Sequence, residues 1–558
     1  VIKENGVVKA EKTAFGSSLS YETTGNILGN DNTGLWAADN NTSVANKYII
    51  ESYYTNNEAK NFSAEIVKNA NFINEGTIGG NRGGVLLQSG AVMSNEGTIN
   101  NTGDYGIYLE DSGTVLNNYS AGKIENYGNY GIFLNEGTKA ENNGLIANRG
   151  KFGIYINNGE AVNSGVIENN DDFGIYALGS ESVIENNGTV KNTGNYGLYA
   201  GNEAKTANNA EGIIENTGNY GIVAGKDSLG INNGIIRNQG TNGMYTTNAG
   251  TIINNGRIEN VGTYGMQATA AGSQAVSGVS GVIANKGTSG LYAINGAHAV
   301  NKGRIENTGD YGMHLNNATG INEGTIHLTG DNKVGVHINN NAVFTNNGTI
   351  IVDGNNVTGI KAMGNSVVQI AQNSQIILNG NAAVTQSSTD YSDKQSTGAA
   401  NSNSAGKAYN IDSTSTLINA GTISAYGTFT VEETGKFVLD TKTGVINAES
   451  INLEGDLHIN AAGTADSFSN KFILENLNTG KLTGGGTLIS DSLLFTGKLE
   501  KNSGGKYDIV MERKNFSEVF NSEFGKILES NYNESGNTEE KSKIYNSLKM
   551  SIRSEERR

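Results

Sequence analysis

One sequence phrase recurs along this chain at a nearly constant interval. Aligning its Asn-x-Gly steps places a glycine at positions 76, 97, 122, 144, 165, 188, 212, 234, 256, 281, 303, 324 and 348. The mean interval is about 22.7 residues, and a fixed period of about 20 to 50 residues is typical of solenoids and other stacked repeats. We therefore expect each repeat to pack against its two neighbours. The length of 558 residues then does not imply several separate domains.

The residues around each glycine predict short strands. Two positions after it, every unit has a β-branched residue, such as Ile99, Val190 or Ile214. Further on, a second glycine opens apolar-x-apolar stretches such as "IYL" and "LYA", and this period of two is that of a β-strand. Asn, Gly, Asp and Thr separate these stretches and favour turns. Each unit should therefore contain about three short strands and no helix.

The absence of proline indicates how these strands pair. Average usage of about 5% would give about 28 prolines, but the chain has none. Because proline cannot donate a hydrogen bond to a strand ladder, this composition favours a chain whose backbone N–H groups are used in ladders throughout. We predict an all-β fold, a right-handed parallel β-helix of about 22–23 residues per coil, with buried isoleucines and asparagines stacked in columns. A leucine-rich repeat, the near alternative, needs an L-x-x-L-x-L pattern and a helical segment, which the units lack.

Changes in composition divide the chain into five parts. Regular repeats span 74–382 and follow irregular coils or an extension at 1–73. A Ser/Thr/Asn-rich loop excursion is expected at 383–410. Larger units at 411–512 should form the last coils and a cap, and the apolar residues of 513–558 recur at the spacing of short C-terminal α-helices.

No motif in the chain predicts catalysis or cofactor binding. Walker, G-x-S-x-G and H-E-x-x-H motifs are absent, and there is no cysteine to bind a metal or form a disulfide. Asp171 and Asp172 are the obvious carboxylate pair, but chain neighbours at a corner point apart. His314 and His337 should lie near each other without a carboxylate, which makes a weak metal site. We expect no catalytic, cofactor-binding or metal-binding residues, and no enzymatic activity.

Charge limits the partners and suggests how the coils hold register. A net charge of −16 argues against a nucleic-acid partner, because such a protein needs basic residues to neutralise phosphates. One residue after the buried isoleucine, successive units alternate in sign, at Glu168, Lys191, Glu215, Arg237 and Glu259. We interpret this column as cross-strand ion pairs between adjacent coils.

An aromatic column is the candidate ligand-binding surface. It occupies the outward position of the strand after the second glycine, and we call it the first aromatic column: Tyr108, Phe133, Tyr155, Tyr176, Tyr199, Tyr245 and Tyr292. Trp36 in "GLWAA" should belong to an earlier copy of the same strand. Exposed aromatic patches often mark interaction surfaces, whereas mutual stacking of the rings would stabilise the coils. Both interpretations stay open at this stage.

Several of these stretches resemble passenger domains of Gram-negative autotransporters, the type V secretion route. The resemblance covers most of the chain, through repeated "NNGTI" and "NTGNYGIYL" and the closing "GGKYDIVMERKNFSEVFNSEF". It implies a β-helical passenger displayed at the cell surface of the outer membrane or secreted, with an autochaperone-like segment near 470–512 and a helical linker toward an outer-membrane β-barrel expected beyond Arg558.

The resemblance also limits the expected function. Protease autotransporters carry a G-D-S-G-S serine motif, which is absent here, so the family implies an adhesin or structural scaffold. The expected partners are a host or bacterial cell-surface protein or glycan, and the chain's own barrel. The alternatives are a β-helical polysaccharide-acting enzyme and an inert stalk for a missing N-terminal domain.

Overall fold

The computed structural model describes most of the chain as two compact units. The described residues are 1–11, 18–55, 61–379, 407–411, 413–431, 433, 435–460, 470–520 and 523–532. The first unit is Val1–Tyr292 with Gly296–His298, and the second is Ala293–Asn295 with Ala299–Arg558. Most of the loop excursion predicted at 383–410, and the helical pattern predicted after residue 532, lie outside the described residues.

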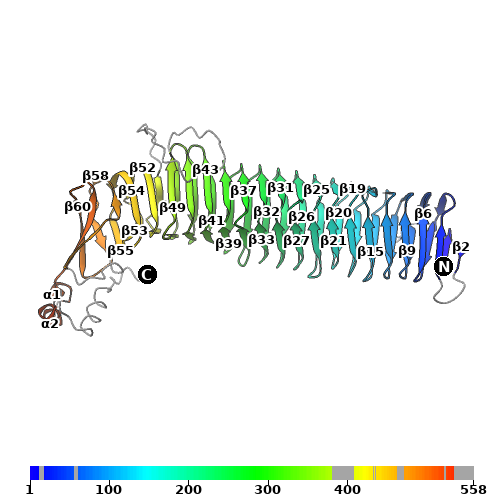
Figure 1. Cartoon of the computed structure of the whole chain (residues 1–558), viewed down its shortest axis with the longest axis horizontal. Helices are drawn as coiled ribbons and strands as arrows, with labels where there is room; N and C mark the ends of the chain where they lie inside the picture. The colour runs from blue at the N-terminus through cyan, green and yellow to red at the C-terminus, as the bar shows by residue number, and fades with distance from the viewer. Residues whose placement is uncertain are drawn as a thin grey trace. The chain divides into compact units, whose positions relative to one another are not determined.

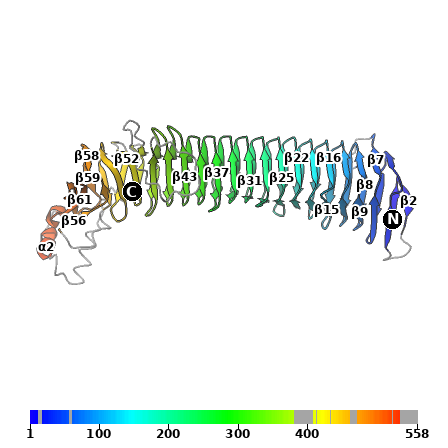
Figure 2. The ribbon, with the colours of Figure 1, turned by 45° about the horizontal axis from the view of Figure 1, so that its top comes forward.

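Each repeat of the first unit forms one coil of three strands. In one such coil, β25 (Thr189–Asn192), β26 (Tyr196–Gly201) and β27 (Lys205–Asn208) follow one another around corners. Every strand pairs in parallel with its copy in the next coil, so that Val190 lies opposite Ile214. Figures 1 and 2 show these strands side by side along the first unit.

The chain is therefore a parallel β-solenoid of about 17 turns, which confirms the predicted fold class. Helix is confined, within the described residues, to two short segments near the C-terminus. The described coils contain none, so the leucine-rich repeat is excluded.

Three sheets run along the regular coils of the first unit. The sheet that carries the buried isoleucines contains β10 (Thr77–Gly80), β13 (Thr98–Asn101), β16 (Lys123–Asn126), β19 (Leu145–Asn148), β22 (Val166–Asn169), β25, β28 (Ile213–Asn216), β31 (Ile235–Asn238), β34 (Arg257–Asn260) and β37 (Val282–Asn285). The aromatic sheet contains β11 (Gly83–Gln88), β14 (Tyr105–Glu110), β17 (Tyr130–Leu134), β20 (Phe152–Asn157), β23 (Phe173–Leu178), β26, β29 (Tyr220–Ala224), β32 (Asn242–Thr247), β35 (Tyr264–Thr269) and β38 (Ser289–Ile294). The third contains β12 (Val92–Asn95), β15 (Val115–Asn118), β18 (Lys139–Asn142), β21 (Glu160–Asn163), β24 (Val183–Asn186), β27, β30 (Leu229–Asn232), β33 (Thr251–Asn254) and β36 (Gln274–Ser277).

The predicted isoleucine column forms the core. Its members in the first unit are all 0% exposed: Ile78, Ile99, Ile124, Ile146, Ile167, Val190, Ile214, Ile236, Ile258 and Ile283. Burying each such side chain stabilises the fold by about 1.5–3 kcal/mol. The corners between strands are equally tight, because a Cβ on Gly218 would lie 1.8 Å from the carbonyl oxygen of Gly194. A side chain at Gly218 would therefore require the backbone of this corner to shift.

Two buried asparagine ladders hold the coils together, as the sequence predicts. In the first asparagine ladder, each Nδ2 donates to the next Oδ1 at 2.7 or 2.8 Å, through Asn46, Asn74, Asn95, Asn118, Asn142, Asn163, Asn186, Asn208, Asn232 and Asn254. In the second, the same bonds measure 2.8 to 3.2 Å, through Asn101, Asn126, Asn148, Asn169, Asn192, Asn216, Asn238, Asn260 and Asn285. All are at most 1% exposed, so the amides satisfy one another in place of water.

The N-terminal residues add an antiparallel hairpin to the solenoid. β1 (Ile2–Glu4) pairs antiparallel with both β2 (Val7–Ala10) and β5 (Leu35–Ala38). β5 also pairs in parallel with β8 (Phe62–Val67), which pairs with β11. Trp36 therefore occupies the outward position that Tyr108 occupies in β14, as predicted.

The second unit also contains three-stranded coils, and its C-terminal part differs from them. β40 (Arg304–Asn307), β43 (Thr325–Thr329) and β46 (Thr349–Asp353) stack in parallel and bury Ile305, Ile326 and Ile350. Near the C-terminus, β56 (Lys471–Leu474), β61 (Tyr507–Arg513) and β60 (Phe495–Lys501) form an antiparallel sheet in that order.

Two short helices, α1 (Phe516–Val519) and α2 (Glu523–Asn531), follow this antiparallel sheet. Neither has the length and apolar character needed to cross a membrane. The guanidinium of Arg513 fixes α2, because it binds both carboxylate oxygens of Glu529 at 2.7 and 3.0 Å. It also lies over the rings of Phe516 and Tyr532.

Candidate ligand-binding surface

The first aromatic column stacks continuously over its first five members. Neighbouring ring centroids from Tyr108 through Phe133 to Tyr155 are 4.8 Å apart with nearly parallel planes. The spacing is 5.3 Å between Tyr155 and Tyr176 and 4.8 Å between Tyr176 and Tyr199. These residues occupy paired positions of successive strands, so the parallel register alone brings them together.

The last two predicted members are separated from that stack. Val223 occupies the column position between Tyr199 and Tyr245, and Gln267 the position between Tyr245 and Tyr292. Tyr245 contacts the ring of Tyr220, and Tyr292 stacks on Tyr264. Each of these two tyrosines therefore packs on a ring outside the predicted set.

A second aromatic column, which sequence reasoning missed, runs beside the first. It stacks with centroid spacings of 4.6 to 5.2 Å through Tyr105, Tyr130, Phe152, Phe173, Tyr196 and Tyr220. Its sequence signal is the aromatic residue directly before the second glycine of six consecutive units.

The two columns interlock edge to face. The planes of Tyr105 and Tyr108 meet at 87°, and those of Tyr196 and Tyr199 at 81°. Edge-to-face and offset-stacked pairs stabilise by about 0.5–1.5 kcal/mol each beyond burial. Because each ring stacks on the next one of its column and meets the other column, the rings are half-buried, and Tyr108 and Tyr292 are only 8% exposed. Ring edges and hydroxyl groups are thus the parts left for a ligand.

Burial controls the acidity of these phenols. It raises the pKa of Tyr108 and of Tyr176 to about 12. The charge of Glu110, Tyr105 and Asp111 adds to the effect at Tyr108, and that of the neighbouring tyrosines adds to it at Tyr176. Burial also raises the pKa of Tyr130, Tyr155 and Tyr199. At neutral pH the columns therefore present neutral hydroxyl groups, which can both donate and accept hydrogen bonds.

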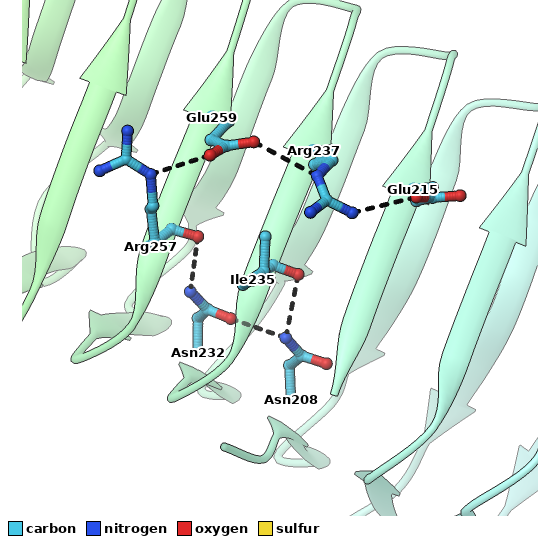
Figure 3. Close-up of polar contacts among 7 residues, drawn as sticks. All are labelled: Asn208, Glu215, Asn232, Ile235, Arg237, Arg257 and Glu259. Carbon is cyan, nitrogen blue, oxygen red and sulfur yellow. Dashed lines mark hydrogen bonds and ion pairs between the residues drawn. The ribbon is translucent and has the colours of Figure 1, made fainter. Parts of the chain in front are cut away.

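The predicted charged column also forms. Lys191 Nζ lies 3.2 Å from a carboxylate oxygen of Glu168, and Arg237 bridges Glu215 at 3.1 Å and Glu259 at 3.3 Å. Figure 3 shows the pairs around Arg237 above the bond from Asn208 to Asn232 in the first asparagine ladder. The charged side chains are 41–50% exposed. Such pairs are worth about 0–1 kcal/mol each, so they support register more than stability.

The second unit contains two histidine contacts. As predicted, His314 and His337 lie together, with ring centroids 4.7 Å apart. Burial lowers the pKa of both imidazoles to about 4. Sequence reasoning missed a buried pair, in which His327 Nε2 lies 2.6 Å from Asp353 Oδ2. Asp353 lies two residues beyond Ile351, the residue that pairs directly with His327 in the next strand. Among the described residues, no group of three or more His, Cys, Asp or Glu side chains could hold a metal ion.

The two aspartates considered as a carboxylate pair lie at a corner of the aromatic sheet. Asp172 accepts a hydrogen bond from Asn195 Nδ2 of the next coil at 2.8 Å, and Asn219 Nδ2 donates to Asn195 at 2.9 Å. In the next two coils the residues that follow Asp172 at this corner are therefore asparagines, and no second carboxylate lies beside Asp172 there.

These features define the class of protein: a β-solenoid with a repetitive outer surface and a separate antiparallel sheet near the C-terminus. Residues 432–515 match the family model of the BigA beta sandwich domain. The matched segment includes β53 (Lys436–Asp440), the antiparallel sheet and the strands between them. No curated protein matches the chain. The match and the β-solenoid together fit a bacterial surface protein.

Proposed function

We propose that this chain is the passenger of a Gram-negative autotransporter and acts at the cell surface as an adhesin on a structural scaffold. The observation that carries the proposal is the pair of aromatic columns on one sheet of a β-solenoid, repeated coil after coil. The BigA beta sandwich match at residues 432–515 supports surface display, and the sequence resemblance supports the type V route. We also propose that the chain has no enzymatic activity.

The ligand is a protein or glycan on a host or bacterial cell, held mainly by hydrogen bonds. Ring faces pack on other rings along the continuous part of the columns, so a sugar ring cannot stack on them as on an open platform. Each coil from the one with Tyr105 to the one with Tyr292 carries at least one phenol at a position of one of the two columns, and neighbouring coils lie about 4.8 Å apart. A repetitive ligand can therefore contact several coils at once, and weak contacts add up.

Two triple variants test this surface. Tyr155→Phe, Tyr176→Phe and Tyr199→Phe together remove three hydroxyl groups but keep the stacked rings. If three hydrogen bonds of about 1 kcal/mol each are lost, binding to cells should weaken on the order of 100-fold. The corresponding triple change to Ser removes the rings as well and should abolish binding.

The control changes Glu168→Gln, Lys191→Gln and Glu215→Gln, which alters the charged column and leaves the aromatic columns intact. This control should bind like the unchanged chain in a flow-cytometry assay. If both tyrosine variants bind cells normally, the aromatic columns are not the contact surface. If the unchanged chain binds no cell or glycan array, the stalk alternative replaces adhesion. Depolymerisation of a glycan by the chain would favour the enzyme alternative.

A further inference from the structure

We propose that the aromatic columns are also an oxidation site, at which a one-electron oxidant joins neighbouring coils through dityrosine. The proposal depends only on the geometry of the rings and holds whether or not the surface binds cells. Its substrate is the protein itself, and its co-reactant is any outer-sphere one-electron oxidant.

The geometry places phenols in pairs. Tyr176 and Tyr199 stack at 4.8 Å with planes 15° apart, and Tyr196 and Tyr220 stack at 5.2 Å with planes 9° apart. The members of each pair occupy directly paired positions of parallel strands, so both side chains extend the same way. The chain thus holds two phenols in contact before any reaction begins, which removes most of the entropic cost of bringing them together.

The reaction balances within each pair. Each phenol gives one electron to an oxidant and one proton to water, which leaves two phenoxyl radicals. A carbon–carbon bond then forms between the two ortho carbons. The hydrogen on each of these carbons moves to the adjacent oxygen, so each bond formed releases two electrons and two protons in total. The new bond links coils that are more than twenty residues apart in the chain.

Phenylalanines interrupt the stacked phenols within each column. Phe133 separates Tyr108 from Tyr155 in the first column, and Phe152 and Phe173 separate Tyr130 from Tyr196 in the second. Because phenylalanine has no phenol to oxidise, the columns contain internal gaps. The same residues show that the fold accepts phenylalanine at column positions, which provides conservative variants.

The test oxidises the dilute protein with light-generated tris(bipyridyl)ruthenium(III) and persulfate, and then cleaves it after lysine and arginine. Three of the resulting peptides are relevant. Tyr176 lies in peptide 152–191, Tyr196 and Tyr199 lie in peptide 192–205, and Tyr220 lies in peptide 206–226. Mass spectrometry of the monomeric fraction should find peptide 192–205 joined to each of the other two, with dityrosine fluorescence. The same treatment in denaturant should lose both links.

Two substitutions should act reciprocally. Tyr199→Phe should remove the link to 152–191 and keep the link to 206–226, whereas Tyr196→Phe should do the reverse. Circular dichroism should be unchanged in both. The proposal is overturned if the folded monomer shows neither link, if dityrosine forms only between molecules, or if both links survive both substitutions.

Discussion

At the scale of the residue, asparagine is the side chain on which this fold most depends. Its amide has a donor and an acceptor in one plane, so a buried asparagine can accept from one coil and donate to the next. Each ladder repeats that contact at almost constant length, from 2.7 to 2.8 Å in the first ladder. The sequence predicts both ladders, because identical amides recur at the coil period and a buried amide requires a partner.

Replacing one rung should therefore cost more than one hydrogen bond. Asn186→Ala removes the acceptor for Asn163 and the donor to Asn208, and both partners stay buried. At about 1–3 kcal/mol for each unsatisfied group, we expect the free energy of unfolding to fall by about 2–5 kcal/mol. Denaturant unfolding measures it. The matched control is Glu185→Ala, an exposed position in the same strand, which should change stability by less than about 0.5 kcal/mol. Equal effects of the two changes would contradict the role of the ladder.

At the scale of the element, one glycine explains why half of the aromatic surface escaped sequence reasoning. A strict period of two predicts that residues three apart, such as Tyr105 and Tyr108, face opposite sides. In β14, Tyr105 and Ile107 pair with residues of β17 and Gly106 between them does not. Gly106 faces the core, because a Cβ on it would lie 3.2 Å from a methyl group of the core residue Ile124. Gly106 and Ile107 thus both face inward, and both tyrosines face outward. The alternation resumes after the glycine, which is why the first aromatic column was predicted.

The half-buried tyrosines should make the solenoid sensitive to alkali. In the unfolded chain their phenols ionise near the ordinary pKa of 10.0, whereas Tyr108 and Tyr176 ionise at about 12 in the folded chain. Between these values the unfolded state has lost protons that the folded state keeps, so the free energy of unfolding falls as pH rises. We expect unfolding midpoints to drop between about pH 10 and about pH 12. The variant Tyr108→Phe with Tyr176→Phe should drop less. A midpoint that does not change over this range would contradict the assigned burial.

At the scale of the whole molecule, the features that repeat were predictable and those that occur once were not. The buried isoleucines, the charged column and the position of Trp36 follow from aligning the units. The hairpin of β1 with β2 and the contact of Arg513 with Glu529 have no second copy in the sequence, so no column reveals them. The pair of His327 and Asp353 was missed because its members are out of register. The repeat pattern likewise does not specify a ligand, because the stacking of the rings on one another accounts for the same columns.

Cross-linking of introduced cysteines tests the central claim, the parallel register of adjacent coils, most directly. The chain has no cysteine of its own. Glu168 and Lys191 are directly paired and partly exposed, at a Cα separation of about 4.8 Å that permits a disulfide. Glu215 lies one coil further, about 9.6 Å from Glu168 and beyond disulfide reach. Under mild oxidation, Glu168→Cys with Lys191→Cys should form an intramolecular disulfide, and Glu168→Cys with Glu215→Cys should not. Equal cross-linking of the two pairs, or of the second alone, would contradict the stacked-coil account.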